Sequence, residues 1–266
     1  MALEETLVGV AADAYSTRLQ IRRGLIKGTT SGLVPDHLQA NLVILPASHA
    51  EDFVEFCRLN QQACPLLAVS RPGDPTLPDL GRDIDIRSDV PGYRVFRRGE
   101  PVVEVSDVAD IWRDDLVTCA IGCSFTFESA LIAAGIPLRH VAEGKNVAMF
   151  ETDRATVGVG LFGGPLVVSM RPLTPADAAR AAAITARFEN AHGAPVHVGS
   201  PAALGVADLA RPDYGEAVSV EPGEVTVFWA CGVTSQRAAE TADLPFFIAH
   251  APGKMLITDI RHPAAA

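Results

Sequence analysis

Short apolar runs, each followed by the start of a helical pattern, are the feature that most restricts how this chain can fold. Asn41–Leu45 stops at Pro46 before a helical pattern, and Leu116–Ile121 passes through a tight turn into another. Pro165–Met170 and Val225–Trp229 repeat the arrangement. Continuous apolar runs of this length are typical of strands buried on both faces, as in parallel sheets. The pattern predicts an α/β fold with a mostly parallel sheet flanked by helices.

The middle of the chain follows a different pattern. Between about residues 145 and 199, several short predicted strands precede one long alanine-rich helix and a returning strand. We expect 145–199 to form a smaller inserted α+β domain, with 1–144 and 200–266 together forming the main α/β domain. Tyr93–Phe96 and Val102–Val105 flank a glycine-containing turn and predict a hairpin.

Composition excludes several classes of protein. Of the 266 residues 48% are hydrophobic and 20% are charged, as in globular proteins. The net charge of -10 disfavours nucleic acid and anionic lipid as partners, and no apolar run approaches the ~20 residues that span a membrane. The acidic start Met1–Glu5 does not resemble an export signal, and the five cysteines show no paired framework. We expect a cytoplasmic protein, for which a homo-oligomer is compatible with the sequence.

Gly122–Glu128 is the sharpest local feature. The predicted turn from strand to helix would place Cys123 and Ser124 where backbone amides and the helix dipole converge. Such a position lowers the pKa of a thiol and suits a bound anion. The plainer interpretation is that Ser124 is an N-cap and Cys123 a small buried residue.

Trp229–Thr234 repeats this arrangement of strand, cysteine, glycine and hydroxyl residue. Gly232 and Thr234 therefore belong to a second predicted helix N-terminus that could bind an anion. Two such turns side by side would form a pocket for a small polyanion. The chain contains no Walker loop and no dinucleotide-binding fingerprint, so no nucleotide cofactor is expected.

Two histidines lie beside a predicted strand. Either His192 or His197 could transfer protons near neutral pH. Their spacing matches no familiar zinc pattern, so no metal is expected. The alternative is that each is a structural histidine bonded to a carbonyl, and His250, beside another apolar segment, shares that ambiguity.

Three more polar residues are candidates for binding substrate. Arg171 follows five apolar strand residues, so its guanidinium would emerge at a strand end and could bind a carboxylate. Lys145 and Asn146 follow a glycine in a predicted turn, where a ligand could approach the backbone. A surface ion pair for the arginine and a solvated turn for the lysine are the alternatives.

Eight stretches, in order between about residues 20 and 260, match a known family pattern. They are Gln39–Pro46, Cys64–Leu67, Trp112–Leu116, Gly122–Glu128, Gly164–Pro172, His192–His197, Phe228–Val233 and His250–Gly253. Together they resemble the D-glutamate cyclase family. The resemblance implies a two-domain α/β fold and a hydro-lyase that reversibly dehydrates D-glutamate to 5-oxo-D-proline.

Ring closure sets three chemical demands: the carboxylate must be neutralised, the ammonium must lose a proton, and water must leave. We expect backbone amides at the two turns to hold the developing oxyanion, and His192 or His197 to act as acid and base. Arg171 is expected to bind the α-carboxylate, with Lys145, Asn146 and His250 as further substrate-binding candidates. A covalent route through a Cys123 thiolate and an acyl intermediate is the alternative mechanism.

Two other functions stay open on sequence grounds. One is an amidohydrolase that uses a cysteine or serine nucleophile on another small amide. The other is a binding protein for small acids that catalyses nothing. In each case the expected partner is small, and for the cyclase it is a dicarboxylic amino acid or its lactam.

Overall fold

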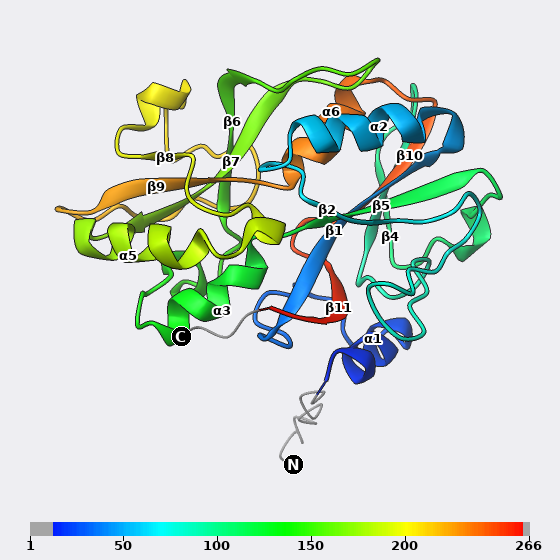
Figure 1. The fold of residues 1–266 in the computed structure, drawn as a ribbon, viewed down its shortest axis with the longest axis horizontal. Helices are drawn as coiled ribbons and strands as arrows, with labels where there is room; N and C mark the ends of the chain where they lie inside the picture. The colour runs from blue at the N-terminus through cyan, green and yellow to red at the C-terminus, as the bar shows by residue number, and fades with distance from the viewer. Residues whose placement is uncertain (1–12, 263–266) are drawn as a thin grey trace, which may run out of the picture.

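The computed structural model describes residues 13–262, which contain two β-sheets (Figure 1). Sheet A has seven strands: β1 (His37–Pro46), β2 (Leu66–Val69), β3 (Tyr93–Arg97), β4 (Val103–Val105), β5 (Leu116–Gly122), β10 (Phe246–His250) and β11 (Leu256–Arg261). Their order is β2-β5-β1-β10-β3-β4, with β11 also paired to β1. The predicted hairpin is confirmed, because β3 and β4 pair antiparallel. The acidic segment Met1–Glu5 lies outside the described residues.

Sheet B has four strands in the order β6-β7-β9-β8. They are β6 (Ala148–Ala155), β7 (Pro165–Leu173), β8 (His197–Val198) and β9 (Val225–Ala230). The helices are α1 (Ala14–Arg22), α2 (Ala47–Leu59), α3 (Phe125–Ala133), α4 (Arg139–Ala142), α5 (Pro175–Thr185) and α6 (Val233–Thr241), with 3-10 turns at Ala109–Ile111, Glu189–Ala191 and Pro201–Leu204. The 145–199 segment supplies β6, β7, α5 and β8, while β9 comes from beyond it. No helix in the described part of the chain is long and apolar enough to span a membrane.

The prediction of a mostly parallel sheet is wrong, because every strand pairing in both sheets is antiparallel. The apolar runs were correct evidence of burial on both faces but not of strand direction. One face of sheet A packs on α2 through Phe53 and Phe56, and the other on a long loop through Leu77, Leu80 and Ile84. An antiparallel sheet covered on both faces therefore carries the apolar pattern that is more common in parallel sheets.

Helices α3 and α6 cross between the two sheets. Helix α3 leaves the end of β5 in sheet A, yet Phe127 and Leu131 pack with α5 and with Trp229 of sheet B. Helix α6 leaves the end of β9 in sheet B, yet Ala238 and Ala239 pack in the core of sheet A. Because each helix begins where it leaves one sheet for the other, both N-termini lie at the junction of the sheets (Figure 1).

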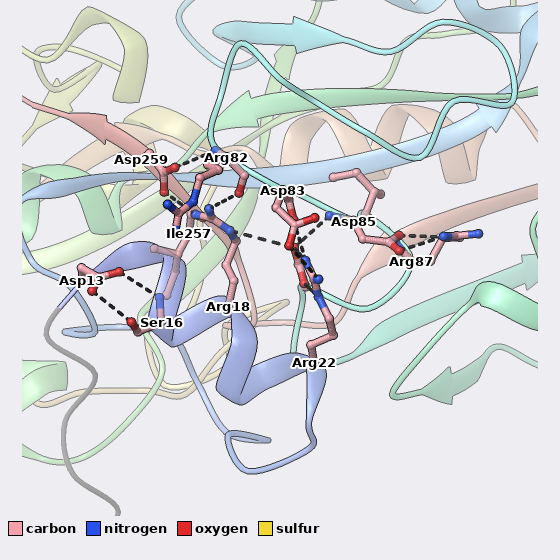
Figure 2. Close-up of polar contacts among 12 residues, drawn as sticks. Asp13, Ser16, Arg18, Arg22, Arg82, Asp83, Asp85, Arg87, Ile257 and Asp259 are labelled. Carbon is pink, nitrogen blue, oxygen red and sulfur yellow. Dashed lines mark hydrogen bonds and ion pairs between the residues drawn. The ribbon is translucent and has the colours of Figure 1, made fainter.

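Partly buried ion pairs hold α1 against β11 and against the loop that precedes β3 (Figure 2). Arg22 donates two hydrogen bonds to the carboxylate of Asp89, at 2.7 and 2.9 Å. The Arg18 guanidinium, which is fully buried, donates to Asp259 at 2.7 Å and to the Ile257 carbonyl at 2.9 Å. These charge-assisted bonds fix α1 next to β11.

Candidate active site

The two predicted turns have the same backbone geometry. Ser124, the N-cap of α3, has φ -61° and ψ -19°, and Gly232, the N-cap of α6, has φ -60° and ψ -20°. In each turn burial raises the pKa of the preceding cysteine, Cys123 or Cys231, and the backbone N–H of the first helical residue offsets part of that rise. The similarity seen in the sequence is therefore a similarity of structure.

Asn41 of β1 lies between the two turns and is buried. Its side-chain amide donates to the Gly122 carbonyl at 2.8 Å, which supports the first turn. A Cβ on Gly232 would lie 2.1 Å from the Asn41 amide nitrogen, so the second turn packs directly against the same side chain. Gly122 has a similar requirement, because its Cβ would lie 1.6 Å from the Asn190 carbonyl oxygen. Both turns need glycine for close packing rather than for unusual dihedral angles.

Gly232→Ala is expected to lower the free energy of unfolding by about 1–3 kcal/mol, because the new methyl group displaces the Asn41 amide from its buried partner. Urea unfolding followed by circular dichroism measures this loss. The double variant Gly232→Ala with Asn41→Ala removes the clash and should cost less than the two single changes added together. Additive costs would show that the two residues do not press on each other.

One cavity at the junction of the sheets contains both turns. It is narrow: the space that water-sized molecules can enter is about 30 Å³, within about 520 Å³ of space outside the protein atoms that includes open solvent. Its described lining consists of Asn41, Arg94, Cys123, Ser124, Phe125, Asn146, Val147, Met149, Tyr214, Cys231, Gly232, Val233, Gln236, His250, Pro252, Gly253 and Met255. Sheet A, sheet B and three loops therefore all contribute to one site.

The lining suits an anion. Among its described residues Arg94 is the single side chain with a full positive charge, and none carries a carboxylate. Within the described residues the N–H groups of Ser124 and Gly232 donate to no other protein atom, so each remains available to a ligand. Helices α3 and α6 add the partial positive charge of their N-termini.

His250 lines the cavity as a neutral ring. Burial, together with the positive charge of Arg94, lowers its pKa to about 4. The Leu42 backbone N–H donates to Nδ1 at 3.1 Å. Nδ1 also lies 3.4 Å from the Leu42 carbonyl oxygen, but the contact with the N–H is the shorter of the two, so Nδ1 is assigned as the acceptor and the ring proton is placed on Nε2. His250 can therefore donate a hydrogen bond from Nε2 to a bound ligand at neutral pH.

Buried charged residues beside the Gly122–Ser124 turn form a hydrogen-bonded network that contacts Ser124. Arg171 and Glu128 form an ion pair whose two side chains are at most 5% exposed, and His140 bonds to the same carboxylate at 3.0 Å. Arg171 also donates to the Ser124 hydroxyl at 3.3 Å. Burial alone would raise the pKa of Glu128, but Arg171 and His140 outweigh it and lower the pKa to about 2. The carboxylate is therefore ionised and balances the charge of Arg171.

The structure brings together half of the site residues proposed from the sequence. Cys123, Ser124, Asn146, Gly232 and His250 all line the cavity. They come from the ends of β5, β9 and β10 and from the loop before β6. No spacing in the sequence shows that these segments meet.

The other five lie outside the cavity lining. Arg171 is fully buried beneath Ser124, and the Thr234 hydroxyl accepts the Val167 N–H at 3.0 Å. Lys145 donates to the Ala217 carbonyl at 2.8 Å and faces a neighbouring cleft, which shares Phe125 and Asn146 with the cavity. His192 bonds through Nδ1 to the Gln62 carbonyl at 3.0 Å beside a separate hollow, and His197 bonds through Nε2 to the Ser200 carbonyl at 2.9 Å.

Sequence reasoning missed four polar residues of the lining: Asn41, Arg94, Tyr214 and Gln236. Asn41 had a signal, since an amide inside an otherwise apolar strand needs a specific partner. Arg94 belongs to the predicted hairpin, where a single arginine in a short strand looks like an ordinary surface residue. In the part of the chain that the structure describes, no group of three or more His, Cys, Asp or Glu residues is arranged to hold a metal ion.

Comparison with known proteins agrees with these motifs. The family model described as D-glutamate cyclase matches residues 117–259, which include both turns and His250. A protein from Bordetella petrii named "Putative hydro-lyase" is 57% identical over 247 residues, which cover 93% of this chain and 94% of that protein. A protein of the same description from Methylobacterium radiotolerans is 57% identical over 251 residues, covering 94% of this chain and 93% of the relative. The chain belongs to the D-glutamate cyclase family.

Among solved structures, a nitrogen repressor-like protein from Methanococcus jannaschii aligns over 88% of this chain and 90% of its own, with a TM-score of 0.38 and 9% sequence identity. A likeness this low carries no argument about the fold or the site.

Proposed function

We propose that this protein is a hydro-lyase that closes D-glutamate to 5-oxo-D-proline with loss of water, and that the reaction takes place in the cavity between the sheets. Membership of the D-glutamate cyclase family supports the lyase class and a small amino-acid substrate. The observation that carries the proposal is the charge of the lining: two helix N-termini, Arg94 and a neutral donor, His250, with no carboxylate among the described lining residues. Such a lining attracts a ligand with two carboxylates.

Ring closure needs no net gain or loss of protons. The α-nitrogen forms a bond to the carbon of the γ-carboxylate, one carbon–oxygen bond of that carboxylate breaks, and two protons of the ammonium leave with that oxygen as water. The barrier lies in the negative charge that collects on the remaining γ-oxygen. A site that holds both ends of the substrate in a folded conformation lowers the entropic part of the barrier as well.

The cavity supplies a group for each of these needs. Arg94 takes the α-carboxylate, the role that the sequence suggested for Arg171. The N–H groups of Ser124 and Gly232, with His250 Nε2, donate to the γ-oxygen as its charge grows. Cys123 lies in the same turn as Ser124, so the alternative route through a thioester stays open and would give a mass increase on this cysteine.

The first test is direct. Purified protein is incubated separately with D-glutamate, L-glutamate and each 5-oxoproline enantiomer, and the products are separated on a chiral column. We expect interconversion of D-glutamate and 5-oxo-D-proline. Ligand-dependent thermal stabilisation without any product would instead favour the binding protein.

Arg94→Ala is expected to lower kcat/KM for the D-enantiomer by about 10²-fold, chiefly through KM, because the α-carboxylate loses its charged partner. Arg94→Lys should recover only part of the loss, since an ammonium cannot form the two parallel bonds of a guanidinium. Arg98→Ala is the matched control: Arg98 lies in the same hairpin but pairs with the exposed Asp243, outside the cavity. Wild-type kcat/KM in Arg94→Ala would place substrate binding elsewhere.

A further inference from the structure

Two thiols lie in the same cavity at equivalent positions of the two turns. Cys123 enters from sheet A and Cys231 from sheet B, and both are buried. A negative charge on Cys231 raises the pKa of Cys123, because two negative charges close together repel each other. The other cysteines, Cys57, Cys64 and Cys119, are buried in the core of sheet A, away from the cavity. A cysteine of this protein can thus be buried without lining the cavity, so burial alone does not explain why Cys123 and Cys231 both line it.

The thiols are also the groups best able to take up and return a proton in this cavity. The described lining has no carboxylate and no lysine, and the guanidinium of Arg94 donates hydrogen bonds but has no site that accepts a proton. His250 already carries a proton on Nε2 while Nδ1 is occupied by a backbone N–H. The Tyr214 hydroxyl donates to Glu151 at 3.1 Å. In both turns burial raises the pKa of the thiol, and the nearby helix N-terminal amide offsets part of that rise.

We propose that Cys123 and Cys231 form a two-thiol proton-transfer pair that exchanges and inverts the α-hydrogen of the amino acid or lactam held in this cavity. One thiolate takes the α-proton: the Cα–H bond breaks, an S–H bond forms, and the electron pair stays on the α-carbon and the adjoining carboxylate. The second thiol then gives its proton to the other face of that carbon and becomes the thiolate. Atoms and electrons balance without a co-reactant. The inference takes its ligand, a small amino acid or its lactam, from the proposed function. The proton transfer itself does not depend on ring closure.

The charges around the ligand favour this step. Arg94 and the two helix N-termini would stabilise the negative charge that moves from the α-carbon into the carboxylate. The Cys231 thiol donates to Met149 Sδ at 3.4 Å, and because a thioether is a weak acceptor the proton can be released to a better one. Burial raises the pKa of both thiols, that of Cys231 to about 11, so exchange should be slow at neutral pH and should rise steadily as the assay is made more alkaline.

The test follows the α-hydrogen in D₂O. D-Glutamate, L-glutamate and the two 5-oxoproline enantiomers are each incubated with the protein, loss of the α-proton signal is measured by NMR, and inversion by chiral chromatography. We expect exchange and inversion with the wild type. Cys123→Ser and Cys231→Ser should each lower inversion by at least about 10²-fold. Each should still exchange one enantiomer with retention, because the remaining thiol serves its own face, and the surviving enantiomer should differ between the two variants.

Cys119→Ser is the matched control, since this buried cysteine of β5 does not line the cavity. It should keep both exchange and inversion. The inference would be overturned if Cys123→Ser and Cys231→Ser both lost α-hydrogen exchange with both enantiomers while Cys119→Ser kept it. Two thiols on opposite faces of the ligand predict that each variant loses exchange with a different enantiomer. Ring closure is measured in the same samples. Ring closure without any exchange of the α-hydrogen overturns the inference and leaves the proposed function standing. Exchange of the α-hydrogen without ring closure overturns the proposed function and leaves the inference standing.

Discussion

Glu128→Gln is expected to lower the free energy of unfolding by about 3–5 kcal/mol, although the change removes only one charge. Glutamine keeps the size of the side chain and one hydrogen bond to Arg171, but the guanidinium is then left in the core without a counter-charge. Arg171 is fully buried, and its nearest other neighbours are hydroxyl groups and the rings of Phe127 and Trp229, at 5.1 and 5.3 Å from the guanidinium carbon. Urea unfolding at pH 7 measures the loss.

A double variant separates the unpaired charge from the other contacts of Glu128. Glu128→Gln combined with Arg171→Met removes both charges and should be clearly more stable than Glu128→Gln alone, because apolar residues of similar volume often replace a buried pair at little cost. The control is Glu55→Gln, which breaks the exposed ion pair with Arg58 on α2 and should change stability by less than about 1 kcal/mol. A double variant as unstable as Glu128→Gln would show that His140 and Ser124 depend on the network for more than charge balance.

The sequence predicted the strands and helices better than their arrangement. The apolar runs at β1, β5, β7 and β9 are strands, and helices follow each of them, because local periodicity and turn residues decide these elements. Strand direction depends on which segments meet across the chain. Burial of both faces of β1, by α2 on one side and by the 77–90 loop on the other, imitates the pattern of a parallel sheet.

The candidate site could be predicted where it depends on local structure. The residues Gly122–Ser124 and Cys231–Thr234 form turns whose chemistry can be read from the sequence, and both turns line one cavity. Arg171 could not be placed, because a strand residue faces a cavity or a core according to which helix covers it. Here α3 covers Arg171 and supplies Glu128 as its partner. Arg94 reaches the cavity only through the pairing of β3 with β10, a long-range contact.

Acidification from pH 7 to 5 is expected to cost the folded protein about 4 kcal/mol, most of it from two buried histidines. Burial lowers the pKa of His192 and of His250 to about 4 in the folded state, against an ordinary value of 6.5. As the pH falls below 6.5 the unfolded chain takes up a proton at each ring and the folded chain does not. Each histidine therefore contributes stability that is complete above pH 6.5 and is lost on the way to pH 4, about 2 kcal/mol of it by pH 5.

Urea unfolding midpoints at pH 7, 6 and 5 measure this loss of stability. Substituting one of the two histidines shows how much of the loss that histidine causes. His192 has a φ of 78°, a left-handed conformation that asparagine tolerates better than most residues, and its Nδ1 bonds to the Gln62 carbonyl, which an asparagine amide can also reach. His192→Asn should lose about half of the pH dependence, whatever its stability at pH 7. Glu128, whose pKa is about 2, weakens folding only below its ordinary value of 4.5, so its contribution falls in a separate window. An unchanged slope between pH 7 and 5 in His192→Asn would show that this ring takes up its proton without unfolding the protein.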